Sequence, residues 1–189
     1  MADGLIGEAT NLVAKFDPAT PSDHVALWQA AYRDFGVKQR VARVSVDALT
    51  RRALSESGLP RINVLVDVYN AVSVLYQVPI GGEDLDHYEG AARLVIASGV
   101  EPFLTNANGE RVTENPEPGE PIWIDDSGVT CRRWNWRQTT RTAIITTTTR
   151  AGFIIDSLDA PSHHGALEAA HHLAELIGTN LIRTIDSTD

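Results

Sequence analysis

The sequence predicts a single α+β domain in which a helical first half precedes a largely antiparallel sheet. Apolar residues recur with helical spacing between residues 22 and 76, bounded by capping and stop residues. Short β-rich segments separated by Gly, Pro and Asn-Gly turns follow between residues 92 and 155. With 189 residues the chain can bury one proper core. We therefore expect one domain over residues 1–189, with a core of about 22–177 and a weakly patterned segment at 1–20.

Two helices are predicted after a breaker cluster at residues 17–21. Ser22 or Asp23 caps the first, and Gly36 stops it. The second begins with Ser45 as its cap and continues to about residue 57. Their inner faces are formed by Val25, Trp28, Ala31, Tyr32 and Phe35 in the first and by Val46, Leu49, Ala53 and Leu54 in the second.

A third helix is predicted over Arg61–Tyr76, which is apolar except for four polar residues. Asn63, Asp67, Asn70 and Ser73 fall at i, i+4, i+7 and i+10, which makes one narrow stripe on a helix. The β-branched content favours a strand, but the stripe favours a helix. Polar groups on a buried helix must be hydrogen-bonded. The stripe therefore either holds neighbouring loops in place or lines a pocket.

A turn with two glycines follows this helix. Gly81-Gly82 precedes Glu83 and Asp84, with a third acid at Asp86. Paired glycines can present backbone N–H groups to an oxyanion or a water, although a plain turn needs no ligand. The spacing excludes a Rossmann fingerprint and a phosphate-binding P-loop.

The remaining pattern is β-rich until a final helix at about Ser162–Ile177. His164, Glu168, His172 and Glu175 lie on the outer face of that helix and could bind a divalent metal. A solvated face is favoured, because the H-E-x-x-H order is missing, and we expect neither a metal nor a cofactor. The β-rich elements are a strand at Arg93–Ala97, a hairpin turn at Asn108-Gly109, an acidic loop at 114–120, strands at Pro121–Asp125 and from Val129, a β-rich run at Thr142–Thr149, a turn at Arg150–Gly152 and a strand at Phe153–Ile155.

Composition narrows the class of protein. The formal net charge of −9 argues against a nonspecific nucleic-acid coat, since such binding depends on neutralising many phosphates. One cysteine excludes an internal disulfide framework and gives no zinc spacing. No apolar run approaches the roughly 20 residues of a membrane span, and the N-terminus lacks the order of a secretory signal. We expect a soluble cytoplasmic protein.

The segment Cys131–Gln138, CRRWNWRQ, is unusual in this acidic chain. It holds three arginines and two tryptophans, and no acidic residue occurs between Ser127 and Ile155. Guanidinium groups match phosphates bidentately, and indoles stack on bases. In the alternative interpretation the tryptophans are core residues and the arginines are solvated or paired with some of the 25 acids. A second basic segment, at residues 37–61, would complete a local anion site if folding brings the two together.

These motifs resemble free-standing B3/B4 domains, a family related to the editing and tRNA-binding domain of the phenylalanyl-tRNA synthetase beta subunit. The resemblance covers about 125 residues, from Trp28 to Ile155, and implies helices around a β-sheet core. It implies that the partner is the 3′ acceptor end of a mischarged aminoacyl-tRNA, held between sheet and helix. The segments that carry it are Trp28–Gly36, Arg43–Pro60, Ile62–Asp67, Val78–Asp86 and Cys131–Thr142.

Within this resemblance, Asn63, Asp67 and Asn70 fall on an Asn…Asp…Asn helix of the synthetase. Pro79 and Asp84 fall on the proline and closing aspartate of its Gly-Gln-Pro-Leu-His-Ala-Phe-Asp run. The chain departs from the family at three points. The histidine of that run is replaced by Gly81, the synthetase has no counterpart of the arginine-tryptophan segment, and the relatives usually carry a further N-terminal strand.

Two functions are consistent with these residues. The first is hydrolysis of a mischarged aminoacyl ester in trans, where positioning a water and stabilising the oxyanion suffice because the ester is already activated. Cys131 as a nucleophile is a weaker variant. The second is a non-catalytic module that binds tRNA or an amino acid. The predicted catalytic residues are Asn63, Asp67, Asn70, Gly81 and Gly82; the predicted substrate contacts are Glu83 or Asp84 for the α-ammonium, Arg132, Arg133 and Arg137 for phosphates, and Trp134 or Trp136 for the terminal adenine, with Asn135 beside them.

Overall fold

The structure, a computed structural model, describes residues 1–17, 20–179 and 183, so residues 18–19 of the predicted breaker cluster lie outside the described residues. None of the helices in this part of the chain is long and apolar enough to cross a membrane. The helices are α1 (Ala2–Val13), α2 (Asp23–Asp34), α3 (Ser45–Ala53), α4 (Val64–Tyr76), the 3₁₀ helix η1 (Leu85–His87) and α5 (Ala160–Ile177); the strands are β1 (Ile80–Asp84), β2 (Arg93–Ile96), β3 (Phe103–Ala107), β4 (Glu110–Glu114), β5 (Pro121–Asp125), β6 (Gly128–Arg132), β7 (Arg137–Gln138) and β8 (Ala151–Ile155).

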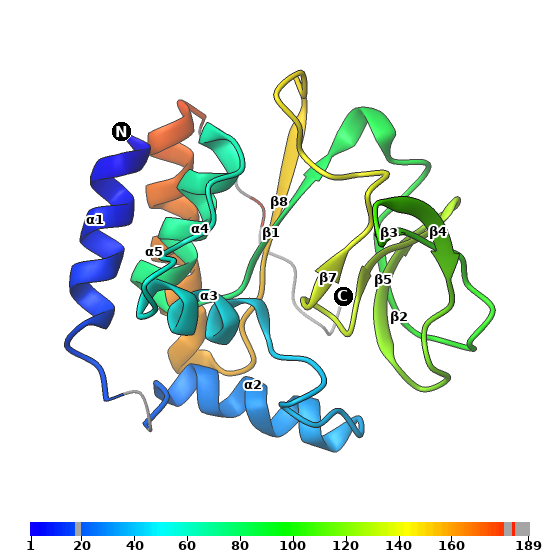
Figure 1. Ribbon diagram of the computed structural model, residues 1–189, viewed down its shortest axis with the longest axis horizontal. Helices are drawn as coiled ribbons and strands as arrows, with labels where there is room; N and C mark the ends of the chain where they lie inside the picture. The colour runs from blue at the N-terminus through cyan, green and yellow to red at the C-terminus, as the bar shows by residue number, and fades with distance from the viewer. Residues whose placement is uncertain (18–19, 180–182, 184–189) are drawn as a thin grey trace.

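The predicted α+β class is confirmed, with helices on one side of the molecule and most strands on the other (Figure 1). Strands β2, β5, β6 and β7 form a four-stranded antiparallel sheet in that order, and β3 pairs with β4. Strands β1 and β8 form a separate antiparallel ribbon that runs between the helices and the larger sheet (Figure 1). The ribbon therefore connects the helical half of the domain to the half that contains the larger sheet.

Helix α4 is the centre of the helical half, and it begins at Val64, three residues after the start of the predicted helix over Arg61–Tyr76. Asn63 caps it by accepting a hydrogen bond from the N–H of Val66 at 3.0 Å. Val68 and Val72 are buried in the core that α4 forms with α1, α5 and the ribbon. The helix ends at Tyr76, because Gln77 takes the left-handed conformation.

Helix α1 was not predicted, since the first 20 residues seemed weakly patterned. The structure shows that Leu5, Ala9 and Val13 repeat at four-residue spacing and are buried against the α4 core. One of the three is a small alanine, and Gly4 and Gly7 lower the helix propensity of the same segment. Tertiary packing therefore decides this helix, and local propensity does not reveal it.

The predicted start of α2 is confirmed, whereas both predicted ends of α3 need correction. Ser22 caps α2 as predicted, by accepting a hydrogen bond from the N–H of Val25 at 3.4 Å. Helix α3 ends at Ala53, four residues before the predicted end, and its N-cap is Val44, which makes no side-chain capping bond. Ser45, the predicted cap, instead lies inside the first turn of the helix, where its hydroxyl is free for another role.

The arginine-tryptophan segment was predicted as one strand, and this is wrong: it forms a hairpin. Strand β6 ends at Arg132, and Arg133 and Trp134 take the left-handed conformation with φ of 48° and 67°. Trp134 N–H donates to Pro121 O at 2.7 Å, which holds this turn against β5. The tryptophans thereby leave the sheet, and Trp134 packs edge-on against Trp28 of α2 at 5.1 Å between ring centroids.

The β-rich run Thr142–Thr149 is a loop in the structure, apart from one isolated bridge between Glu83 and Ala143. Its threonine hydroxyls bond locally and compete with a strand ladder. Thr148 accepts from Ile145 N–H at 3.0 Å and donates to Asp84 at 2.6 Å. The turn predicted at Arg150–Gly152 is displaced as well, because Ala151 and Gly152 are already part of β8.

Gly82 is placed where no side chain fits, which gives a first prediction. A Cβ at this position would lie 2.8 Å from both Ile144 Cδ1 and Tyr69 Cε1. Gly82→Ala is therefore expected to lower the free energy of unfolding by about 1–3 kcal/mol. Gly81→Ala is the matched control, since nothing lies within 4 Å of its Cβ position. Urea denaturation of the two variants checks this, and equal midpoints would contradict the packing argument.

Candidate functional site

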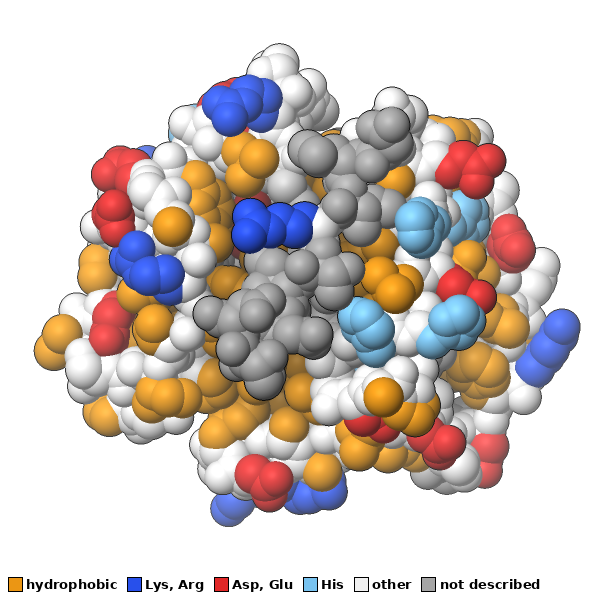
Figure 2. Space-filling view, turned by 180° about the vertical axis from the view of Figure 1, so that it is seen from behind, with side chains coloured by type: hydrophobic (Ala, Val, Ile, Leu, Met, Phe, Trp, Pro, Cys, Tyr) orange, Lys and Arg blue, Asp and Glu red, His pale blue; other side chains and the backbone are white. Residues whose placement is uncertain are grey.

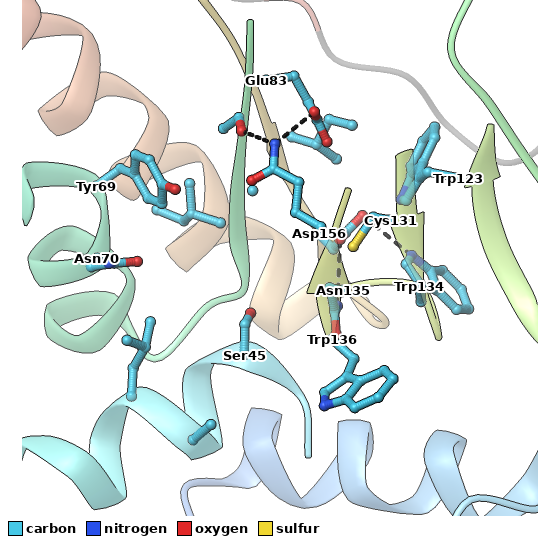
Figure 3. Close-up of a pocket in the computed structure, with 17 residues that line it drawn as sticks. Ser45, Tyr69, Asn70, Glu83, Trp123, Cys131, Trp134, Asn135, Trp136 and Asp156 are labelled. Carbon is cyan, nitrogen blue, oxygen red and sulfur yellow. Dashed lines mark hydrogen bonds between the residues drawn. The ribbon is translucent and has the colours of Figure 1, made fainter. Parts of the chain in front are cut away.

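A cavity of about 270 Å³ lies between α3, α4, the β1–β8 ribbon and the β5–β7 part of the larger sheet (Figure 3). None of its lining residues is Lys, Arg or His. Its walls combine a mainly apolar and aromatic surface with a few polar groups, which is typical of a small-molecule site. The apolar and aromatic lining residues are Ala48, Leu49, Tyr69, Ile80, Trp123, Trp134, Trp136 and Ile154, and the others are Ser45, Asn70, Gly81, Gly82, Glu83, Cys131, Asn135, Gln138 and Asp156.

Glu83 is a buried carboxyl group at this cavity, with 5% of its surface exposed. One oxygen, Oε2, accepts hydrogen bonds from the Thr142 hydroxyl and from Gln138 Nε2, the latter at 2.7 Å. Burial raises the pKa of Glu83 to about 7, against the opposite effect of these two hydrogen bonds. The other oxygen, Oε1, has no hydrogen-bond partner in the described part of the chain. Glu83 can therefore exchange a proton near neutral pH.

Gln138 fixes the position of Glu83. Its Nε2 lies 2.6 Å from Gly82 O, 2.7 Å from Glu83 Oε2 and 3.1 Å from Thr142 O. The side chain thus joins β7 to β1. A glutamine between two sheets can hold the carboxyl group without adding a charge to the cavity.

Asp156 is the second carboxyl group of the cavity and follows β8 directly. It is half-buried, and within the described part of the chain its oxygens accept two long hydrogen bonds, from Trp134 Nε1 at 3.4 Å and Asn135 Nδ2 at 3.5 Å. Burial raises the pKa of Asp156 to about 6, and these two bonds act in the opposite direction. At neutral pH it is therefore mostly a carboxylate, and no cationic side chain of the described residues pairs with it.

Several neutral polar groups of the cavity lining have no hydrogen-bond partner among the described residues, including the Ser45 hydroxyl and the Asn70 side-chain amide. The Ser45 hydroxyl is buried and unpaired. The side-chain amide of Asn70, a residue with 8% of its surface exposed, makes no side-chain hydrogen bond within the described chain. Figure 3 shows both side chains extending from their helices toward the cavity. Buried polar groups are normally satisfied, so these two mark positions where a ligand or water can bind.

The two predicted glycines have different environments. In an antiparallel ladder, successive residues direct their N–H groups to opposite edges of the strand. Leu85 N–H donates to Arg150 O and Asp156 N–H to Pro79 O, so this alternation directs Gly81 toward β8 and Gly82 toward the other edge. Gly82 O accepts from Gln138 on that second edge. Gly82 therefore presents its backbone at the cavity.

Three predicted polar residues have structural partners and do not line the cavity. Asn63 Nδ2 donates to Ile144 O at 3.1 Å, in addition to capping α4. Asp67 accepts from Arg61 Nε at 2.9 Å and from Ile62 N–H at 2.8 Å. Asp84 is almost fully buried, and the Thr148 hydroxyl is first among the hydrogen bonds that hold its pKa below the usual range. The polar stripe is thus mainly a scaffold, and of its residues only Asn70 reaches the cavity.

The three arginines of the hairpin also lie outside the cavity lining. Arg132 is buried and forms a bidentate pair with Glu120 at 2.9 and 2.8 Å. Arg133 lies 4.2 Å from the Trp136 ring centroid, with its Nε 3.5 Å from the same glutamate. Arg137 is half-buried and donates to a threonine of β3 at 2.7 Å. Arg137 Nη1 also lies 3.5 Å from Glu114, so all three arginines match the alternative interpretation, in which arginines pair with acids of the chain.

The second basic segment meets the hairpin but is engaged in similar pairs. Ser45 N–H donates to Asn135 O at 3.2 Å, so folding does bring the two segments together. Arg43 and Arg51, however, both pair with the buried Asp47, at 3.2 and 2.8 Å. The contact between the segments shapes the cavity and places no cation in its lining.

Cys131 belongs to the lining of the cavity (Figure 3). Burial raises the pKa of its thiol well above the usual range, and the charges of Glu83 and Asp156 raise it further. The thiol is therefore protonated at neutral pH, and a protonated thiol is a poor nucleophile.

The histidine-rich face of α5 is remote from this cavity. Figure 2 shows histidine side chains gathered on that face of the molecule. His164 pairs with Glu168 at 3.4 Å, and His172 lies within 3.1 Å of the Tyr76 hydroxyl. Among the described residues no group of three or more His, Cys, Asp or Glu side chains is arranged to hold a metal ion.

Sequence reasoning missed several lining residues, of which Asp156, Gln138 and Trp123 matter most. Asp156 carried one usable signal, since it is the first acid after the long acid-free run and directly follows a predicted strand. The sequence gives no comparable signal for Gln138 or Trp123, because neither residue type is unusual in a strand. Only the pairing of distant strands identifies them.

Comparison with known proteins identifies one family, and its match covers all the residues that line the cavity. A search of curated proteins found no match for this chain. Residues 27–175 match the family model of the B3/4 domain, a domain found in the phenylalanyl-tRNA synthetase beta subunit. The match includes every residue that lines the cavity. Because it covers most of the sequence, this chain belongs to the B3/4 domain family.

Proposed function

We propose that this chain hydrolyses the aminoacyl ester of a mischarged tRNA in trans, with the aminoacyl group held in the cavity. The family supports a nucleic-acid or tRNA-related partner. The observation that carries the proposal is the buried carboxyl group of Glu83, with a pKa of about 7, at a cavity of about 270 Å³. A group that titrates near the working pH is suited to general acid–base catalysis. The volume is at the small end of ligand pockets and suits one amino-acid moiety.

The proposed reaction is direct hydrolysis. A water attacks the ester carbonyl carbon while the Glu83 carboxylate accepts a proton from that water. The bond between the carbonyl carbon and the ribose oxygen then breaks, and the protonated Glu83 returns its proton to the ribose oxygen as it leaves. Gln138 keeps the Glu83 carboxyl group in place through Glu83 Oε2. The other oxygen of Glu83, Oε1, is available to the water.

The developing oxyanion needs hydrogen-bond donors in a site from which water is largely excluded. The Asn70 side-chain amide and the backbone N–H of Gly82 are the proposed donors, since both belong to the cavity lining. Trp123 and Trp136, half-buried in the same lining, offer aromatic surface for the terminal adenine. Of the predicted arginines, Arg137 is the most exposed and is the proposed phosphate contact. A structural role, without contact to the substrate, is proposed for Asn63, Asp67, Asp84, Arg132 and Arg133.

A module that binds an amino acid or a tRNA end without chemistry is the second candidate. The unpaired Ser45 hydroxyl and Asn70 amide favour it, because both can recognise a ligand without any reaction. This candidate makes no use of the raised pKa of Glu83. Turnover therefore separates the two functions.

The test is release of amino acid from a panel of correctly charged and mischarged tRNAs by the purified protein. Enzyme-dependent deacylation of a mischarged pair, lost in Glu83→Gln, is the expected result. Binding of tRNA without release of amino acid would support the second candidate. Absence of both binding and release would show that this chain shares the fold of its family and neither proposed function.

A further inference from the structure

Most buried carboxyl groups of this protein lie beside a cationic side chain that neutralises them, but the carboxyl groups of the cavity do not. Asp47, Asp67, Glu120 and Asp125 each lie within 2.9 Å of an arginine nitrogen. Asp84 lies 3.2 Å from a histidine nitrogen. Glu101 has no ion pair with a described residue, but its two oxygens accept four hydrogen bonds from residues 98–100. Glu83 and Asp156, the two carboxyl groups of the cavity, have no ion pair with a described residue and fewer hydrogen bonds than Glu101. An uncompensated buried charge is costly, so the cavity is the place where a cation from outside would be favoured.

Asp156 needs such a cation more than Glu83 does. Glu83 receives short hydrogen bonds from Thr142 and Gln138, and it can remain protonated at neutral pH. Asp156 receives only the two long bonds from Trp134 and Asn135. Both of these donors are neutral, so the negative charge of Asp156 is not balanced from within the cavity lining.

We propose that Asp156 binds the primary ammonium group of the ligand, and that the site therefore takes an amino acid or aminoacyl ester with a free α-amino group. The two long hydrogen bonds orient the carboxylate and leave acceptor capacity for an ammonium donor. Sequence reasoning assigned this role to Glu83 or Asp84, but Glu83 is engaged by Gln138 and Asp84 lies outside the cavity lining. The identity of the ester rests on the proposed function, whereas recognition of the ammonium does not.

The rest of the cavity fixes the class of the ligand. Leu49, Tyr69 and Ile154 line the apolar wall, which suits an uncharged amino-acid side chain. An N-acylated amino acid lacks the positive charge and would leave Asp156 buried and unpaired. Esters of N-acylated amino acids, including peptidyl esters, are therefore excluded by the same carboxylate that admits free aminoacyl groups.

Isothermal titration at pH 7.5 tests this inference without tRNA or hydrolysis. The probes are leucinamide, methioninamide and phenylalaninamide, each compared with the matching carboxamide that lacks only the α-amino group. At least one amide is expected to bind about 10- to 100-fold more tightly than its partner, the range of a charge-assisted hydrogen bond. In Asp156→Asn the two members of the pair should bind within about threefold of each other. Asp34→Asn, an exposed acid outside the cavity, should keep the wild-type preference.

Several results would overturn the inference. These are equal binding of both members of every pair, an unchanged preference in Asp156→Asn, or no binding of any amide up to its solubility limit. Equal binding of putrescine would show a general cation site with no preference for amino acids. If the preference is found but no tRNA is deacylated, only the proposed function fails. Conversely, equally fast deacylation of N-acetylated aminoacyl-tRNA would contradict this inference alone.

Discussion

Glu83→Gln is expected to lower the rate of aminoacyl ester hydrolysis by about 10²- to 10⁴-fold, the usual contribution of a general base. The amide keeps the shape of the side chain, and its oxygen can still accept the hydrogen bonds from Thr142 and Gln138. It cannot accept a proton from water. Single-turnover release of amino acid from a saturating complex measures this rate directly and separates chemistry from tRNA binding.

The same variant should not unfold, and this distinguishes catalysis from support of the fold. The pKa of Glu83 is raised from 4.5 to about 7 in the folded protein, so the folded state keeps the proton that the unfolded chain releases near pH 4.5. Stability from this group is therefore fully present below pH 4.5 and is lost as the pH rises toward 7. Glu83→Gln removes that loss, so its free energy of unfolding at pH 8 should equal or exceed the wild-type value.

Urea denaturation at pH 5 and pH 8 checks the stability of Glu83→Gln against Glu110→Gln, an exposed glutamate of β4. Only the cavity variant should flatten the pH dependence. If Glu83→Gln is strongly destabilised at pH 8, or if it hydrolyses the ester at the wild-type rate, Glu83 is not the proton acceptor.

The fold could be predicted largely because its main signals are local. The polar stripe of Asn63, Asp67 and Asn70 required a helix, and the Asn108-Gly109 pair required a hairpin; the structure has both. Helix α1 was missed because Leu5, Ala9 and Val13 form a stripe only when α4 provides the surface they cover. The threonine run was misread because hydroxyl groups bond locally in ways that β propensity does not register.

The site was harder to predict, because its residues gain their roles from contacts between distant segments. Gln138 bonds to Glu83 across 55 positions of sequence, and Trp134 reaches Asp156 only because two non-glycine residues of the hairpin turn take left-handed conformations. The arginines illustrate the converse. Their number in one segment indicates an anion, and the structure supplies it as Glu120 for Arg132 and Arg133. The arginines correctly predicted that a guanidinium group binds an anion. They did not predict that this anion is a glutamate of the same chain.

Arg132→Ala is expected to lower the free energy of unfolding by about 3–5 kcal/mol, the cost of breaking a buried ion pair by removing one partner. Glu120 has 3% of its surface exposed, and Arg132 supplies its bidentate contact at 2.9 and 2.8 Å. Arg133 would remain, but its Nε lies 3.5 Å from the glutamate and its guanidinium stacks on Trp136.

Arg93→Ala is the matched control, because the pair of Arg93 with Asp126 is exposed, and such pairs contribute only about 0–1 kcal/mol. Equal losses in the two variants, measured by urea denaturation, would contradict a buried structural role for Arg132. The double variant Arg132→Met, Glu120→Gln should recover part of the loss, since it removes both charges of the bidentate pair and keeps an acceptor for the Arg133 N–H. The recovery is partial because Arg133 loses the anion that lies 3.5 Å from its Nε. Recovery of stability with retained deacylation would show that this pair supports the hairpin without contacting the tRNA; recovery of stability with lost tRNA binding would return Arg132 to the phosphate contacts.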